Sequence, residues 1–112
     1  MNVKITVIRK ADYKDLSEKY ENKIDEPCSL NEGEVFVTDG YTMPDGFCPS
    51  AWQSIYPFAF ALANNGENLY DGWMKNKKSA MVSCNDGFRP VSFLLEAEKN
   101  YNYKISEKEI MD

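Results

Sequence analysis

The stretch SAMVSCNDGFRPVSFLLE, residues 79–96, decides the fold. Two β-rich apolar runs flank Asp86 and Gly87, a dipeptide typical of two-residue hairpin turns. Such a turn places Cys84 opposite Arg89 and puts the apolar residues of both strands on one face. We therefore predict a β-hairpin whose inward face carries Cys84 and Arg89 side by side. The apolar pairs in this register are Val82 with Val91 and Ala80 with Phe93.

Three further elements are predicted before this hairpin. Residues 2–9 alternate between apolar and polar side chains, which is typical of a half-buried strand. Residues 11–21 carry apolar side chains at helical spacing, with Asp12 as the N-cap. Residues 34–38 form a brief strand followed by a turn-rich segment.

The main helix is predicted over residues 49–64, and its broad apolar arc predicts that it is mostly buried. Pro49 suits the first helical position, whereas Pro57 should kink the helix because it lacks an N–H. Gly66 is the expected left-handed residue at the C-terminal end. Cys48 falls at the N-cap or in the first turn.

Together these elements predict an α+β domain over residues 1–97. An antiparallel sheet of about four strands packs on one long kinked helix, with a short N-terminal helix beside it. Trp73 is expected to lie in the core. Residues 98–112 are charged and weakly patterned, so they form a C-terminal extension that we expect to be flexible.

Composition excludes several classes of function. The chain of 112 residues has a net charge of −5 and only two arginines, Arg9 and Arg89, which argues against a nucleic-acid partner. The N-terminus is unlike a signal peptide and no apolar run is long enough to span a membrane, so a cytoplasmic location without a membrane partner is expected. The absence of histidine excludes Ser-His-Asp triads, Cys-His dyads and His-ligated metals.

Three cysteines are too few for a disulfide framework, and an odd number leaves one of them unpaired. Each cysteine is therefore a candidate functional thiol. Cys48 at a helix N-terminus is favoured as a thiolate by the helix dipole, and it packs as a small hydrophobe in the alternative interpretation. Cys84 is a site residue or a core residue, and Cys28 is a site residue or an incidental loop residue. If all three converge, they form a site for zinc or another soft metal, although their long spacing signals this weakly.

Arg89 on an inward face needs a partner because a lone buried charge is costly. Asp45 and Asp86 are the expected carboxylates in the structural interpretation. In the functional interpretation, Arg89 and the N–H groups that open the helix after Cys48 hold a ligand carboxylate or phosphate.

The motifs Pro-Cys, Gly-Phe-Cys-Pro-x-Ala-Trp and Cys-x-Asp-Gly-x-Arg-Pro-Val occur here in that order. They resemble a small family of uncharacterised prokaryotic proteins of about this length, over residues 2 to about 96. The chain departs from that pattern at Ser50, where the family has a second aromatic residue. The resemblance implies no particular activity. The matching positions are Cys28, Cys48, Trp52, Cys84, Asp86, Gly87, Arg89 and Pro90.

The sequence thus predicts a binding domain, not an enzyme, that takes a small anionic molecule or a metal. One alternative is a thiol-dependent redox or transfer enzyme with Cys48 as the nucleophile and Cys84 or Cys28 as the resolving thiol. Another is a structural or oligomeric protein whose cysteines belong to the core. The predicted ligand-binding residues are Asp45, Cys48, Trp52, Cys84, Asp86 and Arg89, and the predicted metal ligands are Cys28, Cys48 and Cys84.

Overall fold

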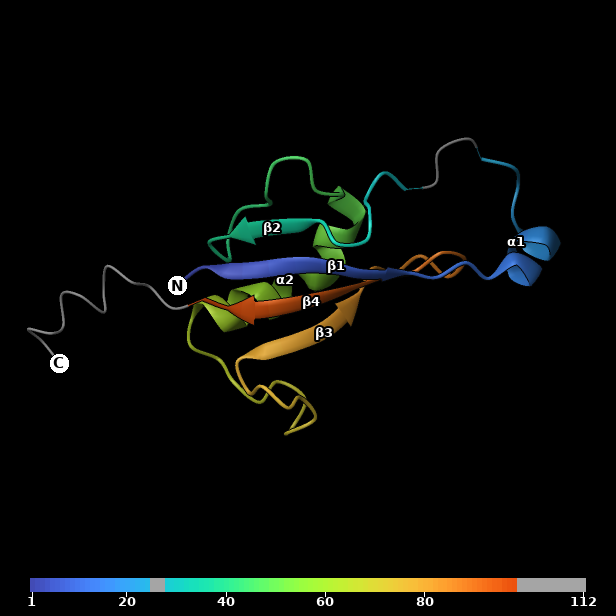
Figure 1. Cartoon of the computed structure of the whole chain (residues 1–112). Coiled ribbons are helices and arrows are strands. Elements are labelled where there is room, and N and C mark those ends of the chain that lie inside the picture. Colours follow the sequence, from blue (N-terminus) through green and yellow to red (C-terminus); the bar gives the residue numbers. More distant parts are fainter. Residues whose placement is uncertain (25–27, 99–112) are drawn as a thin grey trace, which may run out of the picture.

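A computed structural model of the protein describes residues 1–24 and 28–98 (Figure 1). It shows one four-stranded antiparallel sheet and two helices, so the predicted α+β fold class is confirmed. The strands lie in the order β2-β1-β4-β3. Most of the predicted extension lies outside the described residues. The elements are β1 (Val3–Lys10), α1 (Lys14–Tyr20), β2 (Val35–Thr38), α2 (Pro49–Ala63), β3 (Ser79–Ser83) and β4 (Val91–Ala97).

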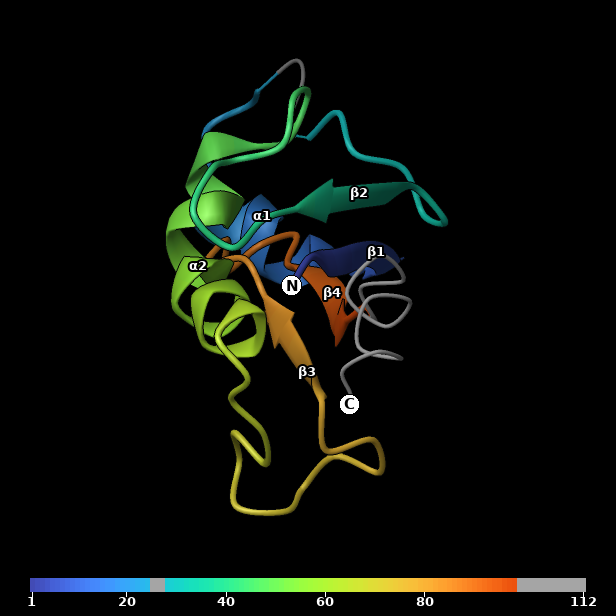
Figure 2. The ribbon, with the colours of Figure 1, turned by 90° about the vertical axis from the view of Figure 1, so that its left-hand side faces the viewer.

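Helix α2 covers one face of the sheet, and the core lies between them (Figure 2). Alternate residues of the strands point into this layer, as the period of a half-buried strand requires. The largest fully buried side chain is Phe93, in the central strand β4. The sheet contributes Val3, Ile5, Val7, Ala80, Val82, Val91, Phe93 and Leu95, the helix contributes Ala51, Ile55, Ala59, Leu62 and Ala63, and loops add Leu30 and Phe47.

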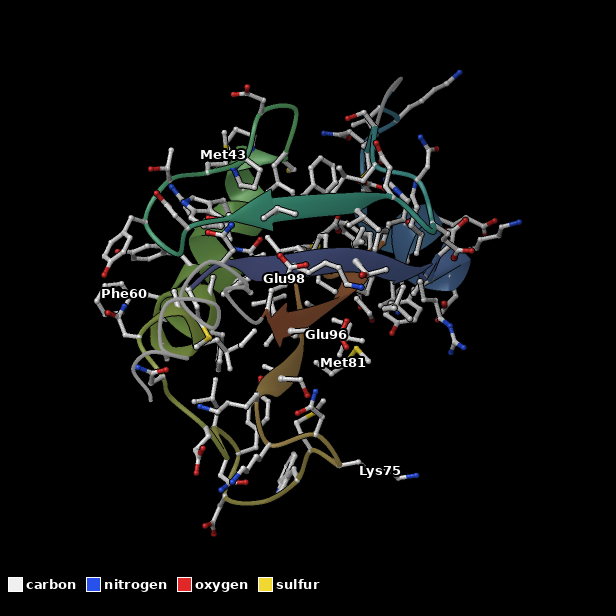
Figure 3. The ribbon with its side chains drawn as sticks, turned by 60° about the vertical axis from the view of Figure 1, so that its left-hand side comes forward. Met43, Phe60, Lys75, Met81, Glu96 and Glu98 are labelled. Atoms are coloured by element: carbon white, nitrogen blue, oxygen red, sulfur yellow. The ribbon has the colours of Figure 1, made fainter. Side chains whose placement is uncertain are left out.

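The opposite face of the sheet has no helix over it among the described residues. Met81 and Glu96 lie on this side, away from α2 (Figure 3). Val35 and Val37 of the edge strand β2 are also exposed. The sheet therefore has one buried and one open face, which explains the clean alternation in β1 and β4.

Helix α2 begins at Pro49 and runs without interruption through Pro57. Its exposed side carries Tyr56 and Phe60, so the prediction of a mostly buried helix was wrong, and the kink at Pro57 stays a prediction. The left-handed residue at the C-terminus is Asn65, with a φ of 68°, and not Gly66 as predicted. Gly66 is instead required for a close approach, because its N–H donates to the carbonyl oxygen of Ala61 at 2.7 Å and a Cβ would meet that same atom.

The hairpin register differs from the prediction. Val82 lies opposite Phe93 and not Val91, so the strands pair two residues further along and the connecting loop is longer. The Asp86 carboxylate accepts the N–H groups of Phe88 and Arg89 at 2.8 and 3.1 Å, which builds a wider turn than a two-residue hairpin. A shift of two residues preserves the face of every side chain, so the apolar pattern could not distinguish the two registers.

Strand β1 continues past the sheet as a narrow ribbon that leads to α1. A register shift between Val7 and Arg9 leaves an extra residue in β1, and pairing then resumes. Beyond the strand ends, the N–H of Ala11 donates to Pro90 and that of Tyr13 donates to Phe88. Helix α1 begins after Tyr13, which is its N-cap; the predicted Asp12 cap is therefore one residue too early.

The prediction that Trp73 lies in the core was wrong, because this residue lies in the loop between α2 and β3. Trp73 is 82% exposed, and its ring stacks on Tyr70 at 5.7 Å between centroids. Tyr70 in turn stacks on Phe58 of α2. The loop has left-handed backbone at Asn68 and Asp71, with φ of 54° and 56°, which the sequence pattern did not indicate.

We expect Phe93→Ala to lower the free energy of unfolding by about 3–5 kcal/mol, because it leaves a cavity in the centre of the core. Trp73→Ala should change it by less than about 0.5 kcal/mol, because the indole is largely in water. Urea unfolding followed by far-ultraviolet circular dichroism measures both. A cost at Trp73 similar to that at Phe93 would contradict the placement of this loop.

Candidate functional site

A pocket of about 360 Å³ lies where the N-terminus of α2 faces the loop that joins β3 to β4. The segment after residue 27 closes it on a third side. Its walls are partly apolar and partly polar, and they bring together residues far apart in the sequence. The lining residues are Cys28, Leu30, Cys48, Ser50, Ala51, Cys84, Asn85, Asp86, Arg89, Val91 and Phe93.

All three cysteines line this pocket, and all three are free, half-buried thiols. The structure therefore brings together three cysteines whose convergence the sequence raised but could not establish. In the described part of the chain, however, no group of three or more His, Cys, Asp or Glu residues is arranged to hold a metal ion. The pocket supplies thiols to a ligand but not a ready set of metal ligands.

The Cys84 thiol is part of the hairpin's hydrogen bonding. Its sulfur accepts the N–H of Val91 at 3.3 Å, while the backbone N–H of Cys84 donates to the Val91 carbonyl at 3.1 Å. At this end of the β-ladder, the sulfur therefore accepts the hydrogen bond that a backbone carbonyl oxygen would usually accept. Cys84 is therefore held in a fixed orientation at the pocket wall.

The N-terminus of α2 opens into the pocket. Cys48 is the N-cap, as predicted, and its side chain caps no N–H group. The first N–H groups of a helix have no intrahelical acceptor, and Pro49 has no N–H, so the free donors nearest the cap belong to Ser50 and Ala51. Both residues line the pocket. The positive end of the helix dipole adds to the attraction for an anion at this point.

Arg89 is paired, but not with the expected carboxylates. Its guanidinium donates to both carboxylate oxygens of Glu21 at 2.7 Å and to the Ser17 hydroxyl at 3.0 Å. The predicted partners Asp45 and Asp86 were therefore wrong. The reason lies in the ribbon beyond β1, which carries α1 alongside the hairpin loop and places Glu21 within reach.

The environment of Arg89 keeps it charged. Hydrogen bonds to Glu21 raise the pKa of the guanidinium above its ordinary value, and the negative charges of Asp86 and Asp12 act in the same direction. The Nε–H group is buried and has no hydrogen-bond partner among the described residues. The arginine also lines a second, more open hollow beside α1, so its side chain separates the two spaces.

The remaining predicted site residues divide into two groups. Asp86 lines the pocket, but one of its carboxylate oxygens is already engaged by the turn. Asp45 lines a different hollow near Thr38. Trp52 is not part of the pocket lining and packs edge-on against Phe47.

Sequence reasoning missed Ser17 and Glu21, which fix Arg89, and the loop residue Asn85. Glu21 is 68 positions away from Arg89, and no local pattern links the two. The rule that a buried arginine needs a carboxylate partner did predict that Arg89 has one. It could not identify Glu21, because every acidic residue of the chain satisfied it.

In comparisons with known proteins, no protein-family model matches the chain, and neither a curated protein nor a solved structure does. The family resemblance drawn from the cysteine motifs therefore stays a prediction. Within the described residues, neither helix has the length and apolar character needed to cross a membrane.

We expect Glu21→Gln to lower the thermal unfolding midpoint clearly, because it removes the one carboxylate that is hydrogen-bonded to the largely buried Arg89 charge among the described residues. The matched control is Glu96→Gln, which removes the longer and less buried ion pair with Lys4 at 3.8 Å and should shift the midpoint little. Differential scanning calorimetry at neutral pH compares the two. Equal shifts of the midpoint in both variants would show that the ion pair of Arg89 and Glu21 stabilises the fold no more than that of Lys4 and Glu96.

Proposed function

We propose that the protein is a non-enzymatic binding domain for a small anionic molecule, held in the cysteine-lined pocket. The ligand's anionic group, a carboxylate or a phosphate, lies at the N-terminus of α2. Its remaining atoms lie against the apolar wall formed by Leu30, Val91 and Phe93. A pocket of about 360 Å³ is at the small end of ligand sites, so the ligand is correspondingly small.

The observation that carries this proposal is the uncapped N-terminus of a 15-residue helix opening into a pocket. Most helices satisfy their first N–H groups with a Ser, Thr, Asp or Asn side chain. Cys48 stands at that position and provides no cap, although a serine there would improve helix stability. The helix therefore lacks the stability that a capping side chain would add, and its first N–H groups stay free. This is expected where a ligand accepts hydrogen bonds from them.

Arg89 supports the anion through its field more than through direct contact. The bidentate pair with Glu21 offsets much of its charge, and Ser17 accepts a further N–H. Asp86 also lines the pocket, and its carboxylate opposes part of the attraction that the helix dipole exerts on an anion. This balance favours a monoanion over a highly charged phosphate ester.

The first test is a direct titration of the protein with inorganic phosphate and with butyrate. Binding is measured from the chemical shifts of the backbone amide signals in NMR spectra. We expect saturable shifts of the Ser50 and Ala51 amides with both probes, and tighter binding of butyrate because its alkyl chain contacts the apolar wall. If these two amides do not move with either probe, the proposal is wrong.

Variants at Cys48 separate binding from folding. Cys48→Asp should raise the free energy of unfolding by about 1 kcal/mol, because a carboxylate caps the helix, and should abolish anion binding by occupying the same N–H groups. The matched control is Cys48→Ser, which also caps the helix but adds no charge, so it should weaken binding less. Butyrate affinity that is unchanged in Cys48→Asp, although the variant is stabilised, would contradict an anion site at this helix end.

A further inference from the structure

Every cysteine of the chain borders the same cavity. Cys28, Cys48 and Cys84 come from three separate segments, and all three line the pocket at the start of α2. Each is a free thiol that is half-buried at the edge of the hydrophobic core. Packing accounts for a buried cysteine at a single position, but it does not explain why all the thiols gather around one space.

The pocket suits a reaction between a thiol and a small molecule better than it suits a metal ion. Among the described residues, the cysteines are not arranged with each other or with carboxylates as a set of metal ligands. Thiol–disulfide exchange requires less, namely one accessible sulfur and room beside it for the incoming disulfide. The cavity of about 360 Å³ provides that room.

Cys48 is the thiol that is best placed for such an exchange. Its side chain caps no N–H group, so a reaction at its sulfur breaks no cap of α2. The sulfur of Cys84, in contrast, accepts the N–H of Val91 at 3.3 Å and is held at the end of the β-ladder. Cys48 is also the cysteine that directly precedes the free N–H groups of Ser50 and Ala51.

We propose that the ligand of this pocket carries sulfur as well as an anionic group, and that Cys48 holds it as a mixed disulfide. This inference rests on the proposed anion site and narrows its ligand to a small thiol-bearing carboxylic acid, which arrives as a low-molecular-weight disulfide. The carboxylate accepts the N–H groups of Ser50 and Ala51. Bound there, the ligand brings its disulfide close to the Cys48 sulfur, so the exchange gains from proximity.

The exchange is balanced without any further oxidant. The Cys48 thiol gives its proton to solvent, and the thiolate attacks one sulfur of the incoming disulfide. A bond forms between Cys48 Sγ and that sulfur while the disulfide bond of the ligand breaks. The other half of the ligand leaves as a thiolate and takes up a proton. Cys48 is thereby oxidised and the leaving half is reduced, and an excess of a small thiol reverses the step.

The charge of the whole chain opposes a preference for an anionic disulfide, which makes such a preference diagnostic. The net charge is −5, and the carboxylate of Asp86 lies in the pocket wall. Glu21 offsets the charge of Arg89. Long-range attraction therefore favours a cationic disulfide. The free N–H groups and the dipole at the start of α2 act in the opposite direction at short range.

The test compares three disulfides that differ in the charge at the end of the same short spacer: bis(2-carboxyethyl) disulfide, bis(2-hydroxyethyl) disulfide and cystamine. The full chain reacts with each at low salt and pH ~8, where an ordinary thiol is partly ionised. Mass spectrometry gives the rate, which is divided by the rate of the same disulfide with 2-mercaptoethanol. We expect the carboxylate disulfide to react about ten-fold faster than the hydroxyl disulfide, and cystamine to be slowest. Peptide mapping should find the label on Cys48.

The matched variants are Cys48→Ser, which should abolish the fast reaction, and Cys84→Ser, which should retain it because a serine oxygen can still accept the N–H of Val91. Circular dichroism checks that both are folded. Equal normalised rates for the carboxylate and hydroxyl disulfides overturn the inference, and so does a label on Cys28 or Cys84.

Failure of the inference and failure of the anion site have different signatures. If butyrate shifts the Ser50 and Ala51 amides but the three disulfides show no order by charge, the anion site stands and the sulfur-bearing ligand is wrong. If butyrate shifts neither amide and the order by charge is also missing, both proposals are wrong.

Discussion

The pairing of β1 with β4 is the constraint on which the rest of the structure depends. It joins the two ends of the domain in the centre of the sheet and orders the buried face around Phe93. The same pairing continues beyond the strands, where Tyr13 donates to the carbonyl of Phe88. That continuation brings α1 to the hairpin loop, so the contact between Glu21 and Arg89 follows from strand pairing many residues away.

The pocket is built from polar groups that are mostly committed to the structure. Asp86 holds the turn, Cys84 completes the ladder, and Arg89 is paired with Glu21. The backbone donors at the start of α2 differ from these groups, because the residue in the capping position does not cap them. The donors that the pocket offers to a ligand are therefore backbone N–H groups and not the side chains that line it.

The sequence predicted the elements well where one periodicity was strong, as in β1 and α2. It also predicted that Cys84 faces inward, although the hairpin register was wrong by two residues, because such a shift does not change the face. The turn itself could not be predicted from Asp86 and Gly87 alone. The side chain of Asp86 bonds the backbone of Phe88 and Arg89, and the strand beyond them is held by the N-terminal ribbon.

The sequence raised the convergence of the three cysteines but could not establish it, because it depends on three separate segments meeting at one helix end. The same limit applies to Arg89, whose partner comes from α1 and not from its own hairpin. Helix α1 is anchored through Arg89, which donates to both Glu21 and Ser17, and through the backbone hydrogen bond from Tyr13 to Phe88. An isolated helix of seven residues is unstable in water, so these long-range bonds, and not the helix propensity of its own sequence, fix where α1 lies.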